Sequence, residues 1–112
     1  MIDEYSFGSI KVNGKKFTGD IIIYPDKITL NWRREQGHLM TQVDIEEVLE
    51  YRPEVLIVGT GAYGLMKIDY RLKGKLKKLE IGLMARKTAE AVEEYNKIYK
   101  DKKVICALHL TC

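Results

Sequence analysis

The segment Gly59-Thr60-Gly61-Ala62-Tyr63-Gly64 has the G-x-G-x-x-G spacing of a dinucleotide-binding turn. In such a turn the glycines let the backbone approach a pyrophosphate, and an acidic residue about 20 positions further on binds the ribose. Glu80 has that spacing, but it lies near the start of a predicted strand, whereas a ribose-binding acid belongs at the end of one. The motif equally fits a tight turn between a strand and a helix, and we favour this interpretation. No cofactor is therefore predicted.

The ends of three predicted parallel strands bring further polar residues together. In open α/β sheets, ligands bind beyond the carboxyl ends of the strands, where loops and helix N-termini present unpaired amides. One strand end delivers the glycine loop, and the next delivers two cations and a hydroxyl. We expect a small anion-accepting crevice formed by Gly59, Thr60, Gly61, Arg86 and Thr88. The alternative is that Arg86 and Lys87 project into solvent and that Thr88 only caps its helix.

Histidine and cysteine give no readable metal or catalytic site. Cys106 and His109 are separated by an odd number of residues, so on one strand they face opposite ways and form a poor zinc site with Cys112. On that strand the two cysteines would lie about 20 Å apart, too far for a disulfide bond. We predict no metal ion and no catalytic residue, and favour a protein that is not an enzyme.

Trp32, Arg33 and His38 lie in a predicted loop over residues 32–41. Tryptophan and arginine are enriched at the centres of protein interfaces, so these residues are candidates for a partner-binding surface. Trp32 fits equally well as a core residue that closes the end of the sheet. Both interpretations remain open.

The composition indicates one folded α/β domain over residues 1–112. Hydrophobic residues make up 46% of the chain and charged residues 31%, and the net charge is +3. This charge is too small for dedicated nucleic-acid binding, no apolar stretch is long enough to span a membrane, and the acidic N-terminus does not resemble a signal peptide. We expect a cytoplasmic protein, and the scarcity of Asn and Gln beside many Lys, Arg and Glu is typical of thermophiles.

The first third of the chain predicts antiparallel strands. Asn13-Gly14 suits a tight hairpin turn between residues 9–12 and 15–18. A second strand pair is expected over residues 21–24 and 27–31, joined by Pro25-Asp26. A short helix should then begin near Asp44 and end at about Tyr51, before Pro53.

The remaining residues alternate between strands and helices. The apolar run 55–58 predicts a strand buried on both faces. Apolar spacings of three and four predict a helix over residues 65–78, whose first amides are free to hold an anion and whose basic residues form a solvated face. A strand over 79–85, a helix from Thr88 to about Lys100 and a strand over 104–110 follow. This order implies a mixed central sheet with three parallel strands.

Several short stretches resemble one small family of unknown function, which includes the adipogenesis-associated domain-containing protein and the mitochondrial complex I assembly factor 3. The matching stretches are Asn31-Trp32-Arg33-Arg34-Glu35 with His38, Pro53-Glu54 leading to Ile57-Val58-Gly59-Thr60-Gly61, Thr88-Ala89-Glu90-Ala91 with Tyr95-Asn96, and Leu108-His109-Leu110-Thr111-Cys112. The resemblance implies a layered α/β fold with about five strands. It brings no catalytic residues, and some relatives act as assembly or regulatory proteins.

The sequence therefore leaves two functions open. The first is a protein-interaction or assembly module with an unidentified protein partner, and the second is a small-molecule or anion-binding domain that uses the glycine loop. The oligomeric state is open and includes a homodimer. A flat apolar patch would favour the first function, and convergent polar groups in a concave site would favour the second.

Overall fold

Strand β10 (Val104–His109) lies at the centre of the main sheet in the computed structural model, which describes residues 1–112. The five strands of this sheet run in the order β5 (Ile28–Thr29), β4 (Ile21–Ile23), β10, β7 (Val55–Thr60) and β9 (Gly82–Arg86). β10, β7 and β9 are mutually parallel, and β4 runs antiparallel to both β10 and β5. The predicted mixed sheet with three parallel strands is therefore confirmed.

A separate three-stranded antiparallel sheet is formed by β1 (Ile2–Ser6), β2 (Ser9–Val12) and β3 (Lys15–Phe17). Asn13 and Gly14, with φ values of 49° and 80°, form the turn between β2 and β3. Positive φ at both central residues is the geometry that a tight hairpin turn needs, and Asn-Gly adopts it readily. The predicted hairpin is confirmed.

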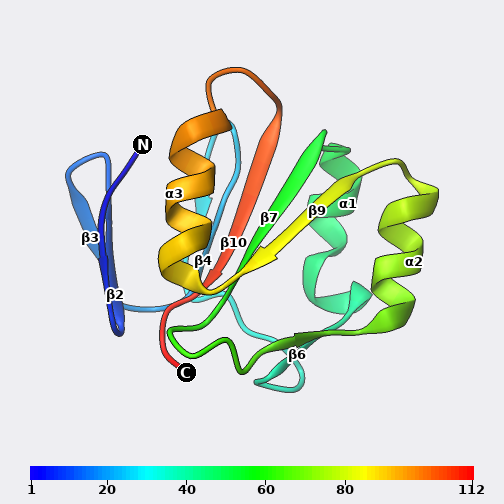
Figure 1. The fold of residues 1–112 in the computed structure, drawn as a ribbon, viewed down its shortest axis with the longest axis horizontal. Coiled ribbons are helices and arrows are strands. Elements are labelled where there is room, and N and C mark those ends of the chain that lie inside the picture. Colours follow the sequence, from blue (N-terminus) through cyan, green and yellow to red (C-terminus); the bar gives the residue numbers. More distant parts are fainter.

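Helices cover both faces of the main sheet (Figure 1). Helix α3 (Thr88–Ile98) and the N-terminal sheet pack on one face, in a core that contains Ile57 and Cys106. Helices α1 (Glu46–Tyr51) and α2 (Tyr70–Lys78) pack on the other, in a core that contains Leu56, Val58 and Ile105. Since alternate residues of β7 and β10 enter different cores, both strands are apolar up to their last residues, Thr60 and His109, as the run 55–58 predicts.

The prediction of a helix from residue 65 is wrong, because α2 begins only at Tyr70. Residues 67–68 instead form the short strand β8 (Lys67–Ile68), which pairs in parallel with β6 (Leu39–Met40) inside the predicted 32–41 loop. Asp69 sets the start of the helix, because its side chain accepts a hydrogen bond of 3.1 Å from the Arg71 amide. The predicted free helix amides next to the glycine loop therefore do not exist.

The remaining differences are strand β1, which the sequence patterns did not predict, and the ends of elements. Asp44 acts at the start of a 3₁₀ helix, Gln42–Ile45, where its carboxylate accepts a 2.8 Å hydrogen bond from the Thr41 amide. The strand expected over residues 79–85 begins only at Gly82. No helix is long and apolar enough to cross a membrane.

Candidate functional site

The parallel strands β7, β9 and β10 end at one edge of the sheet, near the C-terminus (Figure 1). Hydrogen bonds join the three loops that follow them. The Thr88 amide donates to Gly61 O over 3.1 Å, the Thr60 hydroxyl donates to Arg86 O over 3.0 Å, and the Ala62 amide donates to Thr111 O over 2.6 Å. The expectation that these loops meet is confirmed.

Hydrogen bonds within the chain also occupy the donors that the predicted anion crevice needs. The Gly61 amide donates to the Thr88 hydroxyl over 2.9 Å, and that hydroxyl donates to His109 O over 2.6 Å. Thr88 is fully buried and does not cap α3, for which Lys87 is the N-terminal flanking residue. Arg86 is exposed and donates to Ala85 O. The crevice is thus closed by the protein's own groups, and the geometry does not support an anion there.

The glycine loop is explained by packing. Gly61 has a φ of 106°, a conformation that side chains disfavour. A Cβ atom on Gly61 would overlap the Cys112 carbonyl oxygen and lie 2.9 Å from His109 Cδ2. Because α2 begins nine residues later, at Tyr70, its N-terminus does not reach the loop as a dinucleotide site requires. The interpretation as a tight turn fits the structure better.

A buried charged cluster lies at the same edge of the sheet, formed by Asp20, Arg34 and His109. Asp20 Oδ2 is 2.8 Å from His109 Nδ1 and 3.0 Å from Arg34 Nη2. Asp20 Oδ1 accepts the Leu110 amide over 2.8 Å. Because a carboxylate only accepts, the contact assigns a proton to His109 Nδ1. We call these three side chains the charged cluster.

Sequence reasoning did not find this cluster. Asp20 follows Gly19 in an ordinary loop sequence, the sequence pattern presents His109 only as a poor zinc ligand, and Arg34 stands out only within a stretch that resembles a family. The one usable signal is that a charged residue directly before a buried strand must find a partner if the sheet covers it.

The three interaction candidates lie in different environments. Trp32 is buried in the core with α1 and α2, and its indole nitrogen donates to Asp44 O over 3.0 Å. Its ring is therefore unavailable to a partner, in agreement with the alternative that it closes the end of the sheet. Arg33 and His38 are exposed, and the His38 ring meets the His109 ring at a centroid distance of 5.8 Å.

Cys106 and His109 do face opposite sides of the sheet. Cys106 packs in the core beneath α3, whereas the His109 ring lies beside His38 and bonds to Asp20 of the charged cluster. No group of three His, Cys, Asp or Glu side chains is arranged to hold a metal ion. Cys106 and Cys112 are both free thiols.

Exposed aromatic side chains form a second feature of this edge. Phe7, in the turn between β1 and β2, is 57% exposed, and Tyr63, in the glycine loop, is 66% exposed. Their ring centroids are 6.2 Å apart. We call Phe7 and Tyr63 the edge patch; sequence reasoning missed it because exposure of the turn and the loop depends on the assembled fold.

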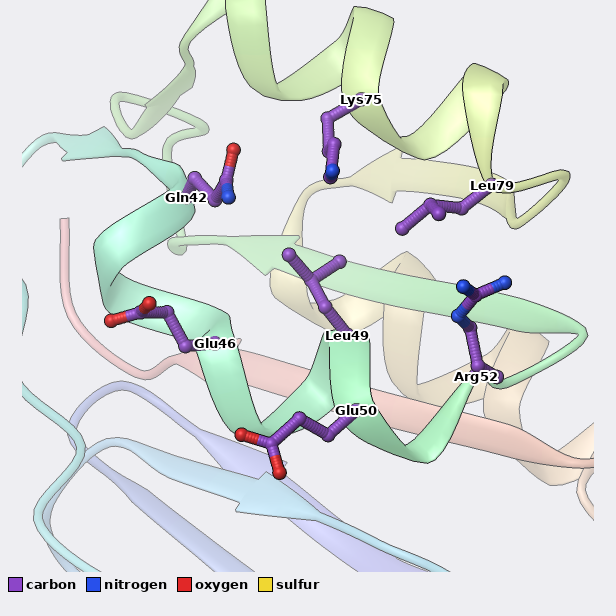
Figure 2. A pocket seen from close by; sticks show the side chains of 7 residues that line it. All are labelled: Gln42, Glu46, Leu49, Glu50, Arg52, Lys75 and Leu79. Carbon is purple, nitrogen blue, oxygen red and sulfur yellow. The ribbon is translucent and has the colours of Figure 1, made fainter.

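A cavity of about 350 Å³ lies away from this edge, between α1 and α2 (Figure 2). Its lining residues are Gln42, Glu46, Leu49, Glu50, Arg52, Lys75 and Leu79. In Figure 2, Lys75 extends from α2 into the cavity, whereas Glu46 and Glu50 point away from α2. The polar groups therefore do not converge on one position, as they do in most small-molecule sites.

Comparison with known proteins supports the fold and gives the family. A conserved hypothetical protein from Pyrococcus horikoshii OT3 is 29% identical, with 100% of this chain and 99% of that chain covered and a TM-score of 0.88. A protein described as an outer membrane protein from Bartonella henselae is 30% identical, with 99% and 94% covered and a TM-score of 0.83. A Mth938-like domain from Bordetella pertussis is 20% identical, with 98% and 85% covered and a TM-score of 0.63.

The first of these relatives is a thermophile homologue. The model of one family of proteins of unknown function, DUF498/DUF598, matches residues 2–109. The match spans all but a few terminal residues and includes every strand of the main sheet. The chain belongs to the DUF498/DUF598 family.

Proposed function

We propose that this domain is a protein-interaction module that binds another protein through the edge patch. The observation that carries the proposal is the pair of exposed, neighbouring aromatic rings of Phe7 and Tyr63. Aromatic side chains are enriched at interface centres, where burying each ring contributes a large apolar area with few rotatable bonds. A flat apolar patch is also the feature that distinguishes this function from small-molecule binding.

Hydrogen bonds hold the backbone next to both aromatic residues. The residue after Phe7 is fixed because the Gly8 amide donates to Leu110 O over 2.9 Å. The residues on either side of Tyr63 are fixed by the bonds from Ala62 to Thr111 O and from Gly64 to Gly61 O. A partner therefore meets rings whose supporting loops are already ordered, which lowers the entropic cost of binding.

Two further features support the proposal. The sequence resembles a family in which some members act in assembly or regulation, a role that requires protein partners. The glycine-loop donors needed for the alternative function are already bonded within the chain. We also propose a cytoplasmic location, supported by two free thiols, which are typical of reducing compartments.

Affinity capture from the native cell extract tests the proposal, with Tyr63→Ser as the variant. Tyr70→Ser is the matched control, because Tyr70 is also an exposed tyrosine, at 79%, but lies on α2 away from the edge patch. We expect Tyr63→Ser to lose a captured protein that the wild type and Tyr70→Ser retain. Retention of every captured protein by Tyr63→Ser would contradict the proposal.

A further inference from the structure

Two nitrogen atoms of the charged cluster have no hydrogen-bond partner although they are buried. They are Arg34 Nη1 and His109 Nε2. The two side chains are only 5% and 8% exposed. Buried polar atoms in folded proteins nearly always have a partner, because an unpaired one loses its hydration without compensation. Two such atoms on neighbouring side chains indicate that something other than the protein completes the cluster.

Asp20 and residues next to the charged cluster hold these two side chains in fixed positions. Arg34 donates from Nε to Gly37 O over 2.9 Å and from Nη2 to Asp20 over 3.0 Å, and its guanidinium stacks on the Trp32 ring at 4.6 Å. Arg34 Nη2 and His109 Nδ1 are 3.2 Å apart, because both donate to one oxygen of Asp20. The guanidinium and the imidazole therefore lie against each other, and each has one nitrogen without a hydrogen-bond partner.

The chemistry of the two nitrogens defines what can complete the cluster. Arg34 Nη1 can only donate, so the missing group must accept. His109 Nε2 accepts when the ring is neutral and donates when it is charged, since Nδ1 already carries a proton. A deprotonated oxyanion satisfies both atoms when His109 is charged, and a protonated one satisfies both when His109 is neutral. A metal cation is disfavoured, because the fixed positive charge of Arg34 lies beside the imidazole.

His38 is the exposed neighbour of the His109 ring. Its ring lies edge-on to His109 at 5.8 Å between centroids. Asp20 carries one negative charge, and its ion pair with Arg34 already balances that charge. When His109 is charged, the cluster carries one net positive charge in a buried place, which favours a bound anion.

We propose that Arg34 and His109 form the floor of a binding site for a small oxyanion, a carboxylate or an inorganic phosphate, with His38 as its cover. This site does not depend on the edge patch or on the proposed protein partner. It also differs from the predicted crevice at Gly59, Thr60, Gly61, Arg86 and Thr88, whose donors are bonded within the chain. The ligand must be small, because Arg34 Nη1 and His109 Nε2 are both buried.

Nuclear magnetic resonance of the histidine imidazoles and arginine guanidinium groups tests this proposal. Sodium formate and sodium phosphate are titrated separately at constant pH and about 0.15 M chloride, which screens non-specific attraction. We expect a saturable shift of the His109 Nε2 and Arg34 Nη1 resonances with at least one of the two anions. The formate and phosphate titrations show whether a carboxylate or a phosphate is preferred.

Variants separate a bound anion from general charge effects. Arg33→Gln removes the same charge from the adjacent, exposed arginine and should keep the anion-induced shift of His109 Nε2. Arg34→Gln should lose that shift. Because Arg34→Gln removes a buried contact and can fail to fold, His38→Ala provides a second test on an exposed side chain. We expect His38→Ala to stay folded and to exchange the anion faster than the wild type.

The contrary results are equally definite. No saturable shift in the wild type with either anion would overturn the proposal. Equal anion-induced shifts of His109 Nε2 in folded Arg34→Gln and in the wild type would also overturn the proposal. An unchanged exchange rate in His38→Ala would show that His38 is not the cover.

Discussion

His109 Nδ1 lies 2.8 Å from Asp20 Oδ2, although the two residues are 89 positions apart. The register of the sheet explains this contact. β4 and β10 are antiparallel with Ile21 opposite Leu108, so Asp20, directly before β4, falls opposite His109. The sheet thus places a carboxylate and an imidazole side by side, and Arg34 joins them from the following loop.

Replacing Asp20 by asparagine should destabilise the fold strongly. Arg34 would remain buried with its charge uncompensated, and losing one member of a buried ion pair costs about 3–5 kcal/mol of unfolding free energy. Urea denaturation measures this difference. Asp101→Asn, in an exposed turn, is the control and should shift the free energy by less than about 0.5 kcal/mol. Similar urea midpoints for the two variants would show that the charged cluster does not stabilise the fold.

Alanine at position 61 should be poorly tolerated. A Cβ atom there would overlap the Cys112 carbonyl oxygen in a backbone conformation that disfavours side chains. We expect a loss of more than about 1 kcal/mol of unfolding free energy. Gly37→Ala is the matched control, since its Cβ would meet no atom within 4 Å. If Gly61→Ala is as stable as Gly37→Ala, the glycine is not required for packing and a ligand-binding role for the loop regains support.

The two cysteines should differ sharply in reactivity. Cys106 is fully buried, and burial raises the pKa of its thiol, whereas Cys112 is partly exposed. Only the thiolate reacts readily, so the native protein should release one equivalent of Ellman's chromophore and the unfolded protein two. Cys112→Ser should abolish the native reaction. A rapid native reaction in that variant would place Cys106 in contact with solvent.

Stability should decline in strong alkali partly through Tyr95. Burial, with smaller contributions from Cys106 and Tyr99, raises the pKa of Tyr95 from about 10 to about 12. The folded state therefore favours the neutral phenol. This contribution is complete below pH 10 and is lost as the pH rises through 12. Tyr95→Phe should flatten the decline between pH 10 and 12 in thermal melts, and Tyr70→Phe, on the surface, should not. Identical slopes in the three proteins would refute this assignment.

Local sequence signals predicted the main sheet well, because each signal acts on its own neighbours. Asn13-Gly14 specifies its turn through backbone conformation alone. The run 55–58 has to be buried on both faces, and only a central strand allows that. The helix predicted from residue 65 failed because an apolar side chain such as Ile68 packs against the same core from a strand as it would from a helix.

The charged cluster and the edge patch could not be read in the same way. Arg33 and Arg34 are adjacent and chemically alike, yet one is exposed and the other is nine-tenths buried. Which of them turns inward depends on Trp32 and on Asp20, and the position of Asp20 depends on the register between β4 and β10. Phe7 and Tyr63 likewise meet only because two loops flank the same C-terminal segment.

Photo-crosslinking in the native cell tests the proposed function most directly. Benzoylphenylalanine replaces Tyr63 in one protein and Tyr70 in another, and both positions are exposed. If the edge patch binds a protein partner, light should join position 63 to one defined protein of another sequence, and position 70 should give no such product. Products of equal yield at both positions, no product at position 63, or a product made only of two copies of this chain would contradict the proposed function.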